Sequence, residues 1–408
     1  MGVLFPEDGV SRAKETLEAY EARGGYQALR RGLEPEAIVG LVEAAGLTGR
    51  GGAGFPTARK WRLAREQPGP RYVVMNGGED EPGSHKDRIL MEHHPHLVLE
   101  GVLLAARALE AEAAYLYVNH NYTKAHASLR QALDQATAAG DVQMKVELFA
   151  APSEYVAGED TASLEAIEGR KPLPRQKPPY PTVAGLFGKP TVVNNVETFA
   201  NVPRIVLNGA DWFKAIGSGG CRGTAIFCLG DEVERPGAYE LPFGTPLSGL
   251  IAKGGGLKGG KKIKAILPGG PSSAFLKADQ VDVPLDYQSL KDAGSALGCG
   301  VVHLVAEGEC LVEEVARIAD FFARECCGQC PPCRMETGML KAILEKVQKG
   351  DGNAEQIAQL DKVVAFAKGK GLCGFIHMPG PPILSAVRHF PQDFQSHIQD
   401  KRCPASTA

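Results

Sequence analysis

The sequence lacks several features that would assign the chain to a membrane, secreted or nucleic-acid-binding class. No apolar run approaches the roughly 20 residues needed to cross a bilayer. The first residues, MGVLFPED, show no basic region followed by an apolar core, and the net charge of −3 gives no basic excess for nucleic acid. The ten cysteines form no disulfide-like framework, which fits a reducing compartment. We therefore expect a cytoplasmic protein with no nucleic-acid partner and no direct membrane insertion. Peripheral attachment to a membrane through partner subunits stays open.

The first half of the chain has the pattern of an α/β layer structure. The 408 residues leave room for two or three domains. Residues 11–45 follow a helical pattern, and strand-like segments then alternate with helical ones. The predicted strands are 71–75, 114–118 and 145–150, and the predicted helices between them are 95–109 and 122–138.

The second half of the chain has two predicted regions, a β-rich one followed by a helical one. From about residue 223 short strands and turns predominate, which indicates a small separate β-rich domain. From Cys310 onward helices dominate and frame a cysteine-rich loop. The predicted strands include 224–230 and 262–267, and the predicted helices are 247–252, 337–347, 354–367 and 383–390.

Three cysteines in CGQCPPC stand at two-residue gaps: Cys327, Cys330 and Cys333. Thiols this close point into one concavity and favour a soft metal centre. A C-x2-C-x2-C run with one distant thiolate is typical of a [4Fe–4S] cluster, whereas zinc sites more often pair two C-x2-C hooks. We interpret the run as a [4Fe–4S] site, with tetrahedral zinc as the alternative. We expect Gly328 and the two prolines after Cys330 to hold the loop open.

The fourth ligand is predicted to be Cys373, because nearby glycines on both sides let the backbone approach a cluster closely. Cys403 is less favoured because it lies in a polar tail. Cys326 breaks the two-residue spacing and follows the apolar-periodic segment 312–322, so we interpret it as a packed residue at a helix end. The remaining cysteines are scattered and are interpreted as core or surface thiols: Cys221, Cys228, Cys299 and Cys310.

The glycine-rich segment GRGGAGFP at 49–56 contains the pattern G-x-G-x-x-G. The context of a dinucleotide-binding βαβ unit is not met, because a helix precedes the segment where a strand should stand and Pro56 follows it. Glycines nevertheless let backbone N–H groups gather around a phosphate or lie flat beneath a ring. A ligand-binding loop and a purely structural loop both stay open at this point.

Polar residues follow the predicted strands where each strand ends. The segment 76–83 follows the first strand, Glu159 and Asp160 follow the third, and the tandem amides Asn194 and Asn195 come after a proline-rich segment. Ligands of open α/β sheets bind at the carboxyl ends of the strands. A ligand site is therefore indicated there, against the alternatives of a solvated acidic face and of helix-capping asparagines.

In this order, the motifs resemble the flavin-carrying NADH-oxidising subunit of respiratory complex I and the diaphorase subunits of NAD-linked hydrogenases and formate dehydrogenases. The resemblance covers nearly the whole chain. It is carried by GRGGAGFPT at 49–57, by Asn76 and the segment 79–88, by Gly158 and Glu159, by NNVET at 194–198, and by the cysteine run. It implies a Rossmann-like α/β domain for FMN and NADH at 1–215, a β-grasp domain at 223–306 and a helical [4Fe–4S] domain at 310–400.

The resemblance also implies an activity: oxidation of NADH at FMN, with electrons passed singly through the [4Fe–4S] cluster to partner subunits, among them a second iron–sulfur subunit. The alternatives are an NAD(P)-reducing diaphorase subunit of a formate dehydrogenase or hydrogenase, and a non-catalytic electron relay. No catalytic acid or base is expected, because hydride transfer requires stacking, orientation and exclusion of water rather than proton transfer.

Each implied site residue is assigned by the motif in which it stands. FMN is implied to contact Gly49, Arg50, Gly51, Gly52, Lys60, Asn76, Glu79, Tyr155, Gly158, Glu159, Asn194 and Asn195. The nicotinamide nucleotide is implied to contact Phe55, Glu81, Asp160, Lys177 and Tyr180.

Three positions depart from the family pattern. Gly78 stands where an acidic residue is usual, Asp160 stands where a glutamate is usual, and Leu63 stands near the place of an expected aromatic residue. Asp160 resembles the acid that repels a 2′-phosphate, so its shorter side chain leaves the preference for NADH over NADPH open.

Overall fold

The computed structural model describes the whole chain except residues 1, 6–7, 12, 219, 404 and 406–408. The chain divides into two compact units, which we call unit 1 and unit 2. Unit 1 consists of Met1–Asp80, Ser84–Cys228 and Gly237–Thr245. Unit 2 consists of Glu81–Gly83, Leu229–Pro236 and Pro246–Ala408.

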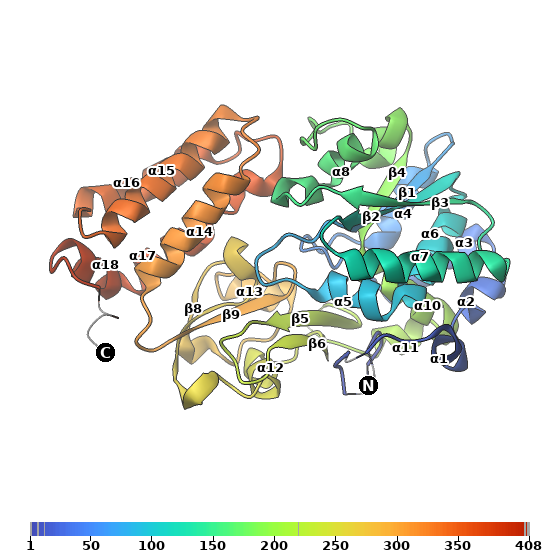
Figure 1. Ribbon diagram of the computed structural model, residues 1–408, viewed down its shortest axis with the longest axis horizontal. Helices are drawn as coiled ribbons and strands as arrows, with labels where there is room; N and C mark the ends of the chain where they lie inside the picture. Colours follow the sequence, from blue (N-terminus) through green and yellow to red (C-terminus); the bar gives the residue numbers. More distant parts are fainter. Residues whose placement is uncertain (1, 6–7, 12, 219, 404, 406–408) are drawn as a thin grey trace. The chain divides into compact units, whose positions relative to one another are not determined.

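Unit 1 is built on a parallel four-stranded sheet with the strand order β3-β2-β1-β4 (Figure 1). The central strands read YVVMNG and AAYLYVN, and near-continuous apolar runs are typical of parallel strands that are covered on both faces. In register, Tyr72 pairs with Ala113 on one side and with Thr191 on the other. The predicted α/β layer structure is confirmed. The strands are β1 (Tyr72–Gly77), β2 (Ala113–Asn119), β3 (Lys145–Ala151) and β4 (Thr191–Asn195).

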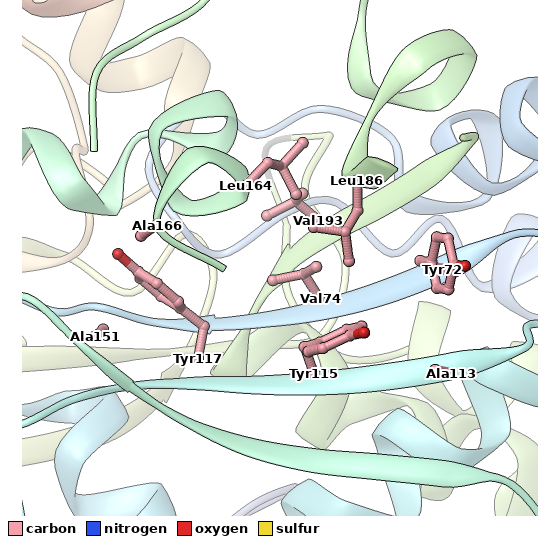
Figure 2. Close-up of a cluster of buried hydrophobic side chains, with 10 residues drawn as sticks. All are labelled: Tyr72, Val74, Ala113, Tyr115, Tyr117, Ala151, Leu164, Ala166, Leu186 and Val193. Atoms are coloured by element: carbon pink, nitrogen blue, oxygen red, sulfur yellow. The ribbon is translucent and has the colours of Figure 1, made fainter. Parts of the chain in front are cut away.

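One face of this sheet carries a buried cluster of aromatic and aliphatic side chains. Figure 2 shows Val74 and Tyr115 projecting from neighbouring strands on the same side as Leu164. The Tyr117 hydroxyl donates a hydrogen bond of 3.0 Å to the Ala157 carbonyl. These contacts hold the segment that follows β3 against the carboxyl-terminal half of the sheet.

The helices of unit 1 confirm the predicted segments 95–109 and 122–138 and the helical character of the stretch 11–45. It is divided into three helices, because Gly24 and Gly32 take positive φ angles of 85° and 63° that end a right-handed helix. The helices are α1 (Leu17–Ala22), α2 (Gln27–Arg30), α3 (Pro35–Ala45), α4 (Thr57–Arg65), α5 (Lys86–His93), α6 (Pro95–Leu109), α7 (Thr123–Ala138), η1 (Tyr155–Gly158), α8 (Asp160–Ile167), α9 (Pro181–Ala184), η2 (Leu186–Gly188), α10 (Val196–Asn208) and α11 (Ala210–Lys214).

The remaining strands confirm the β-rich pattern predicted after residue 223. The strands β5 (Thr224–Leu229) and β6 (Gly237–Pro242) are hydrogen-bonded neighbours. In unit 2, β7 (Ile263–Leu267) pairs antiparallel with both β8 (Leu276–Lys277) and β9 (Val301–Ala306). The short helices of this region are α12 (Leu247–Lys253), η3 (Lys258–Gly260), η4 (Gly270–Ser272), η5 (Ala278–Gln280) and α13 (Tyr287–Asp292).

The helical end of unit 2 contains one correction to the cysteine loop. Pro331 and Pro332 do not hold a loop open but begin a helix, because proline fits the first helical positions, where no N–H partner is needed. Cys330 stands at the N-cap position of this helix and Cys333 lies in its first turn. The helices are α14 (Leu311–Glu325), α15 (Pro331–Gln348), α16 (Ala354–Ala367), η6 (Gly374–His377), α17 (Gly380–His389) and α18 (Pro391–Ile398).

His303 of β9 lies between two carboxylates of unit 2. Its Nδ1 is 3.4 Å from Glu232 Oε1, and its Nε2 is 3.3 Å from Glu314 Oε1. Burial disfavours the imidazolium, but the hydrogen bonds to both carboxylates outweigh burial and raise the pKa of His303 to about 10. An unfolded histidine has a pKa of about 6.5, so the stability that this charge supplies is complete below that pH and declines as the pH rises toward the folded pKa.

We therefore expect the thermal unfolding midpoint of the wild-type protein to fall between pH 6.5 and 10 more steeply than that of a His303→Gln variant. Differential scanning calorimetry across this range measures both slopes. If the unfolding midpoints of the two proteins fell equally steeply with pH, His303 would not be a protonated imidazolium paired with these carboxylates in the folded protein.

Candidate functional site

The carboxyl ends of β1 and β4 bring together several residues predicted to contact FMN. Asn76 and Asn195 are paired in register across these strands. The Asn76 side chain donates a hydrogen bond of 2.8 Å to the Gly158 carbonyl, and the Gly78 N–H donates one of 3.2 Å back to Asn76 Oδ1. Asn76 thus joins the end of β1 to η1, which begins at Tyr155.

The glycine-rich loop lies beside the end of β4. A Cβ added at Gly51 would stand 3.2 Å from the Asn195 Cβ, so glycine permits a close approach of the loop to this strand end. The loop is closed by a hydrogen bond of 2.9 Å from the Gly49 N–H to the Phe55 carbonyl. Gly52 takes a φ of 106°, which side chains other than that of glycine rarely adopt. The loop therefore presents backbone, not side chains, beside the sheet edge.

Arg50 stabilises this loop through its side chain. Its buried guanidinium donates hydrogen bonds to the carbonyls of Thr48, Thr224 and Arg222 at 2.7 to 3.1 Å and lies over the ring of Phe243. The guanidinium is thus occupied by backbone carbonyls of unit 1. Its predicted contact with FMN stays a prediction.

Lys60 of α4 supplies a buried positive charge near the same strand end. Its Nζ donates a hydrogen bond of 3.0 Å to the Val193 carbonyl, and burial lowers its pKa. The ion pairs found among the described residues do not include Lys60. The neighbouring Asn194 is fixed by a hydrogen bond of 3.1 Å from Trp61 Nε1. A lysine without a paired carboxylate, next to a glycine loop and amide side chains, fits an electron-rich or anionic ligand such as FMN.

A buried charge network supports these asparagines, and sequence reasoning gave its members no role. Lys86 Nζ lies 2.8 Å from Asp87 Oδ1, 2.9 Å from Glu197 Oε2 and 3.1 Å from Asn195 Oδ1. Asn195 Nδ2 donates to Asp87 Oδ2 at 2.6 Å. Lys86 and Glu197 are each about 1% exposed. All of these residues stand in polar motifs of the sequence, but no local pattern indicates that they contact one another.

Glu79 is held by the first turn of α5. Its carboxylate accepts hydrogen bonds from the backbone N–H groups of Asp87 and Arg88 at 3.1 and 2.9 Å and from the Ser84 hydroxyl. Burial and the nearby Asp87 carboxylate raise the pKa of Glu79 to about 7. Glu79 therefore orders the turn after β1, and its contact with FMN stays a prediction.

Glu159 and Asp160 begin α8 and share Lys177. Glu159 caps the helix by accepting from the N–H groups of Thr161 and Ala162 at 2.8 and 2.9 Å. Lys177 Nζ lies 2.6 Å from Glu159 and 2.9 Å from Asp160. Burial and the adjacent Asp160 raise the pKa of Glu159. Lys177 therefore pairs with two adjacent carboxylates at the N-terminus of α8.

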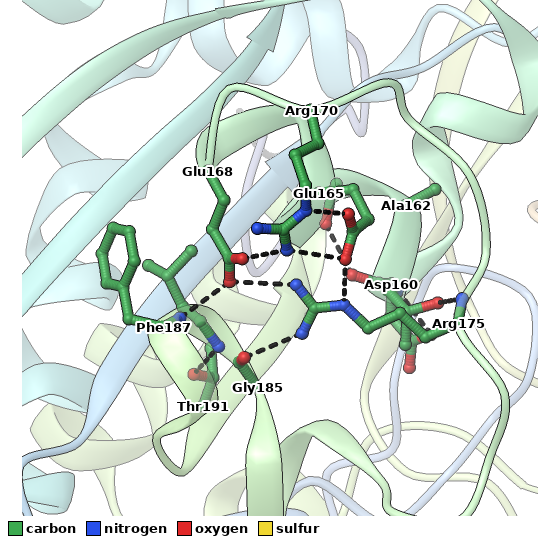
Figure 3. A network of polar contacts seen from close by, with 12 residues as sticks. Asp160, Ala162, Glu165, Glu168, Arg170, Arg175, Gly185, Phe187 and Thr191 are labelled. Atoms are coloured by element: carbon green, nitrogen blue, oxygen red, sulfur yellow. Dashed lines mark hydrogen bonds and ion pairs between the residues drawn. The ribbon is translucent and has the colours of Figure 1, made fainter.

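The Arg175 side chain attaches the proline-rich segment that follows α8 to that helix. Figure 3 shows Arg175 between Glu165 and Glu168, with a further hydrogen bond of 2.8 Å to the Gly185 carbonyl. The backbone N–H of Arg175 donates to Thr161 Oγ1 at 2.8 Å. This anchor fixes the segment that carries Lys177 and Tyr180.

The aromatic residues predicted to contact the nucleotide are accessible. Phe55 is 39% exposed and Tyr180 is 59% exposed. Exposed aromatic side chains next to an ordered polar site are suited to stacking on a ring. Glu81 belongs to unit 2, whereas Phe55, Asp160, Lys177 and Tyr180 belong to unit 1.

In unit 2 the four predicted metal ligands line one small cavity. The Leu372 N–H donates to Cys330 Sγ at 3.4 Å, a type of contact that tunes iron–sulfur clusters. The walls are otherwise apolar, which suits a cluster shielded from water. The cavity is lined by Cys326, Cys327, Cys330, Cys333, Gly371, Leu372, Cys373, Phe375 and Ile376.

Cys326 corrects one interpretation from the sequence. It stands at the C-cap of α14 as expected, but its side chain lines the cavity, with its Sγ 3.7 Å from that of Cys333. The cavity thus contains five thiols, one more than a cube requires. Its donor set of sulfur atoms fits a [4Fe–4S] cluster, and the exclusion of Cys326 as a ligand stays a prediction.

Comparisons with known proteins agree with both sites. Residues 42–204 match the family described as the Nuo51 FMN-binding domain, and residues 313–397 match the NADH-ubiquinone oxidoreductase-F iron–sulfur binding region. Residues 226–276 match the SLBB domain. The fold and sites therefore define the class of NADH dehydrogenase subunits that carry FMN and a [4Fe–4S] cluster.

Within this class, the chain belongs to the family of the F subunits of NADH-quinone oxidoreductase. It is 40% identical to the F 2 subunit of Rhizobium meliloti (strain 1021), over 95% of this chain and 96% of that protein. It is 39% identical to the F subunit of Escherichia coli (strain K12), over 94% of this chain and 90% of that protein.

A solved structure of the NAD+-reducing [NiFe]-hydrogenase in the H2-reduced state is also similar. It shares 35% identity with this chain at a TM-score of 0.86, over 95% of this chain and 67% of that one. The expected family, enzyme class and cofactors are thus confirmed, and the chain is a subunit of a larger assembly. Among its described helices, none has the length and apolar character to span a bilayer.

Proposed function

We propose that unit 1 of this chain binds FMN and oxidises NADH there, and that a [4Fe–4S] cluster on unit 2 passes the electrons singly to a second iron–sulfur subunit. One observation carries the proposal. The same chain holds a glycine-and-amide site at the carboxyl ends of a parallel sheet and a cavity lined by the predicted thiolate ligands. When bound, FMN takes up an electron pair as hydride and gives electrons up one at a time.

The residues of unit 1 would hold and orient the flavin. The backbone of the Gly49–Gly52 loop would face the cofactor, since its glycines leave no side chains in the way. Asn76, Asn194 and Asn195 would supply amide groups at the strand ends. Lys60 would place its positive charge beside the electron-rich part of the ligand.

The residues around α8 would receive the nucleotide. Phe55 and Tyr180 offer exposed aromatic faces, and Asp160 offers a carboxylate that Lys177 holds in place. A carboxylate here would disfavour the extra phosphate of NADPH by charge repulsion. The contact of Glu81, a residue of unit 2, with the nucleotide stays a prediction.

In unit 2, Cys327, Cys330, Cys333 and Cys373 would ligate the cluster. The apolar wall of the cavity would exclude water, and the Leu372 N–H would help to set the reduction potential of the cluster.

We also propose the three-domain division 1–215, 223–306 and 310–400, with the middle part a β-grasp domain. The match of residues 226–276 to the SLBB domain supports the middle assignment. Attachment to a membrane would be peripheral, through partner subunits.

Replacing Gly158 tests the flavin site. An alanine Cβ there would stand 2.7 Å from the Gly78 carbonyl oxygen and would separate η1 from the end of β1. Overpacking of this kind costs about 1–3 kcal/mol, so we expect FMN to bind Gly158→Ala about five-fold to a hundred-fold more weakly. Two quantities should fall together: the amount of FMN that the protein retains after gel filtration, and the rate at which it reduces ferricyanide with NADH.

Gly40→Ala is the matched control, because Gly40 lies within α3 and its added Cβ would meet nothing within 4 Å. It should retain wild-type FMN content and activity. If Gly158→Ala bound FMN as tightly as this control, the proposed position of the flavin would be wrong.

The similarity to the hydrogenase structure favours one second candidate, the NAD(P)-reducing diaphorase of a hydrogenase or formate dehydrogenase. The two candidates differ in the partners of the chain. Affinity purification from the native cell, followed by mass spectrometry, should recover membrane subunits under the first proposal. Recovery of a nickel or molybdenum subunit would favour the second.

A further inference from the structure

Three potential metal ligands lie together in unit 2, and none of them lines the cysteine cavity described above. Cys310 precedes the first turn of α14, His397 stands in the last turn of α18, and Cys403 follows α18. Their ligand atoms all lie within 4.8 Å of one another, and Cys310 Sγ is 3.2 Å from His397 Nε2. Cys310 is buried, as expected of a core thiol, but it is not isolated from other potential ligands.

The histidine is oriented as a metal ligand would be. His397 Nδ1 lies 3.1 Å from the Gln348 carbonyl, which can only accept a hydrogen bond, so Nδ1 carries the proton. The lone pair of Nε2 then faces Cys310. Metal-binding histidines usually make this contact with a carbonyl or carboxylate, because it fixes both the tautomer and the ring orientation.

The two helices are held in this arrangement without the ligands themselves. Asp393 stands one turn before His397, and its Oδ2 accepts from the Leu311 N–H at 3.0 Å and from Lys264 Nζ at 2.5 Å. Leu311 directly follows Cys310. A partly buried ion pair and a backbone hydrogen bond thus hold Cys310 and His397 near each other without either ligand atom taking part.

We propose that Cys310, His397 and Cys403 bind one zinc ion, which ties the segment after α18 to the start of α14. Two thiolates and one imidazole are the donors that zinc prefers, and two thiolates neutralise its charge in a buried place. Tetrahedral zinc separates two ligating sulfurs by about 3.8 Å, and sulfur from nitrogen by about 3.6 Å. The observed 3.2 Å between Cys310 Sγ and His397 Nε2 is shorter than the sulfur–nitrogen value, and all three ligand atoms lie within 4.8 Å of one another, within reach of one ion.

The proposal is independent of the flavin and the cluster, and metal content tests it. The full chain, loaded with its cluster, is equilibrated with zinc alone and passed through a desalting column, and zinc and iron are then measured by mass spectrometry. We expect about one zinc per wild-type chain. Cys310→Ser, His397→Gln and Cys403→Ser should each lower zinc at least five-fold and leave iron unchanged. Cys299→Ser, a thiol outside both clusters, should change neither metal.

X-ray absorption spectroscopy at the zinc K-edge identifies the ligands in the wild-type protein. This test needs no substitution, so it stays valid if a variant fails to fold. Two sulfur neighbours and one nitrogen neighbour are expected. Three outcomes would overturn the proposal: no zinc retained by the wild-type chain, zinc retained undiminished by the Cys310 and Cys403 variants, or a Cys310–Cys403 disulfide detected by intact mass and peptide mapping.

Discussion

Cys330→Ser is expected to remove the iron–sulfur cluster while FMN stays bound. Cys330 stands in the middle of the predicted ligand set, at the N-cap position of α15, so its replacement should leave the set one thiolate short. The flavin residues belong to unit 1 and the cysteine cavity belongs to unit 2. The loss of one thiolate should therefore not reach the glycine loop.

Iron and acid-labile sulfide should fall to background in this variant, and FMN released by denaturation should stay at the wild-type level. Cys299→Ser is the control for a cysteine that does not line the cavity, and it should keep both cofactors. Loss of FMN together with iron would show that the two sites do not form independently.

Lys86→Met is expected to destabilise unit 1 by about 3–5 kcal/mol, because it leaves two buried carboxylates without their cation. Asp87 and Glu197 lie 2.8 and 2.9 Å from Lys86 Nζ and are almost fully buried. The variant also removes a hydrogen bond to Asn195, so we expect the affinity for FMN to decrease along with the stability of unit 1.

Tryptophan fluorescence during denaturant unfolding measures this effect in unit 1 alone, because the two tryptophans of the chain, Trp61 and Trp212, both lie there. Lys214→Met is the matched control. Lys214 pairs with Asp211 on the surface, where a pair contributes about 0–1 kcal/mol. A double variant with Glu197→Gln should recover part of the loss. Equal effects of Lys86→Met and Lys214→Met would contradict the role of the buried network.

The sequence predicted those parts of the fold that depend on local pattern. The alternation of strand-like and helical segments predicted the α/β layer structure of unit 1, because each such segment shows its own hydrophobic periodicity. The two-residue spacing of the cysteines predicted a common cavity, because such a short segment cannot place its thiols far apart. The motifs at the strand ends predicted that Asn76, Gly158 and Asn195 lie at one edge.

The sequence did not indicate side-chain partners that are distant along the chain. The Arg50 guanidinium binds carbonyls more than 170 residues away, which its motif does not indicate, and its predicted contact with FMN stays a prediction. Cys310 and His397 are 87 residues apart, and no local pattern links them. Cys326 was excluded by its spacing, although the end of α14 turns its thiol into the cavity. Such contacts follow from packing of whole helices, which periodicity does not specify.

The central claim is that this one chain takes hydride from NADH at a flavin and passes single electrons to an iron–sulfur cluster. Anaerobic titration of the purified chain with NADH, followed by visible absorbance and by electron paramagnetic resonance, tests it most directly. The account predicts that the flavin absorbance bleaches and that the signal of a reduced [4Fe–4S] cluster appears. A flavin that stays oxidised in excess NADH, or a preparation that holds zinc in place of iron in the cavity of Cys327, Cys330, Cys333 and Cys373, would contradict it.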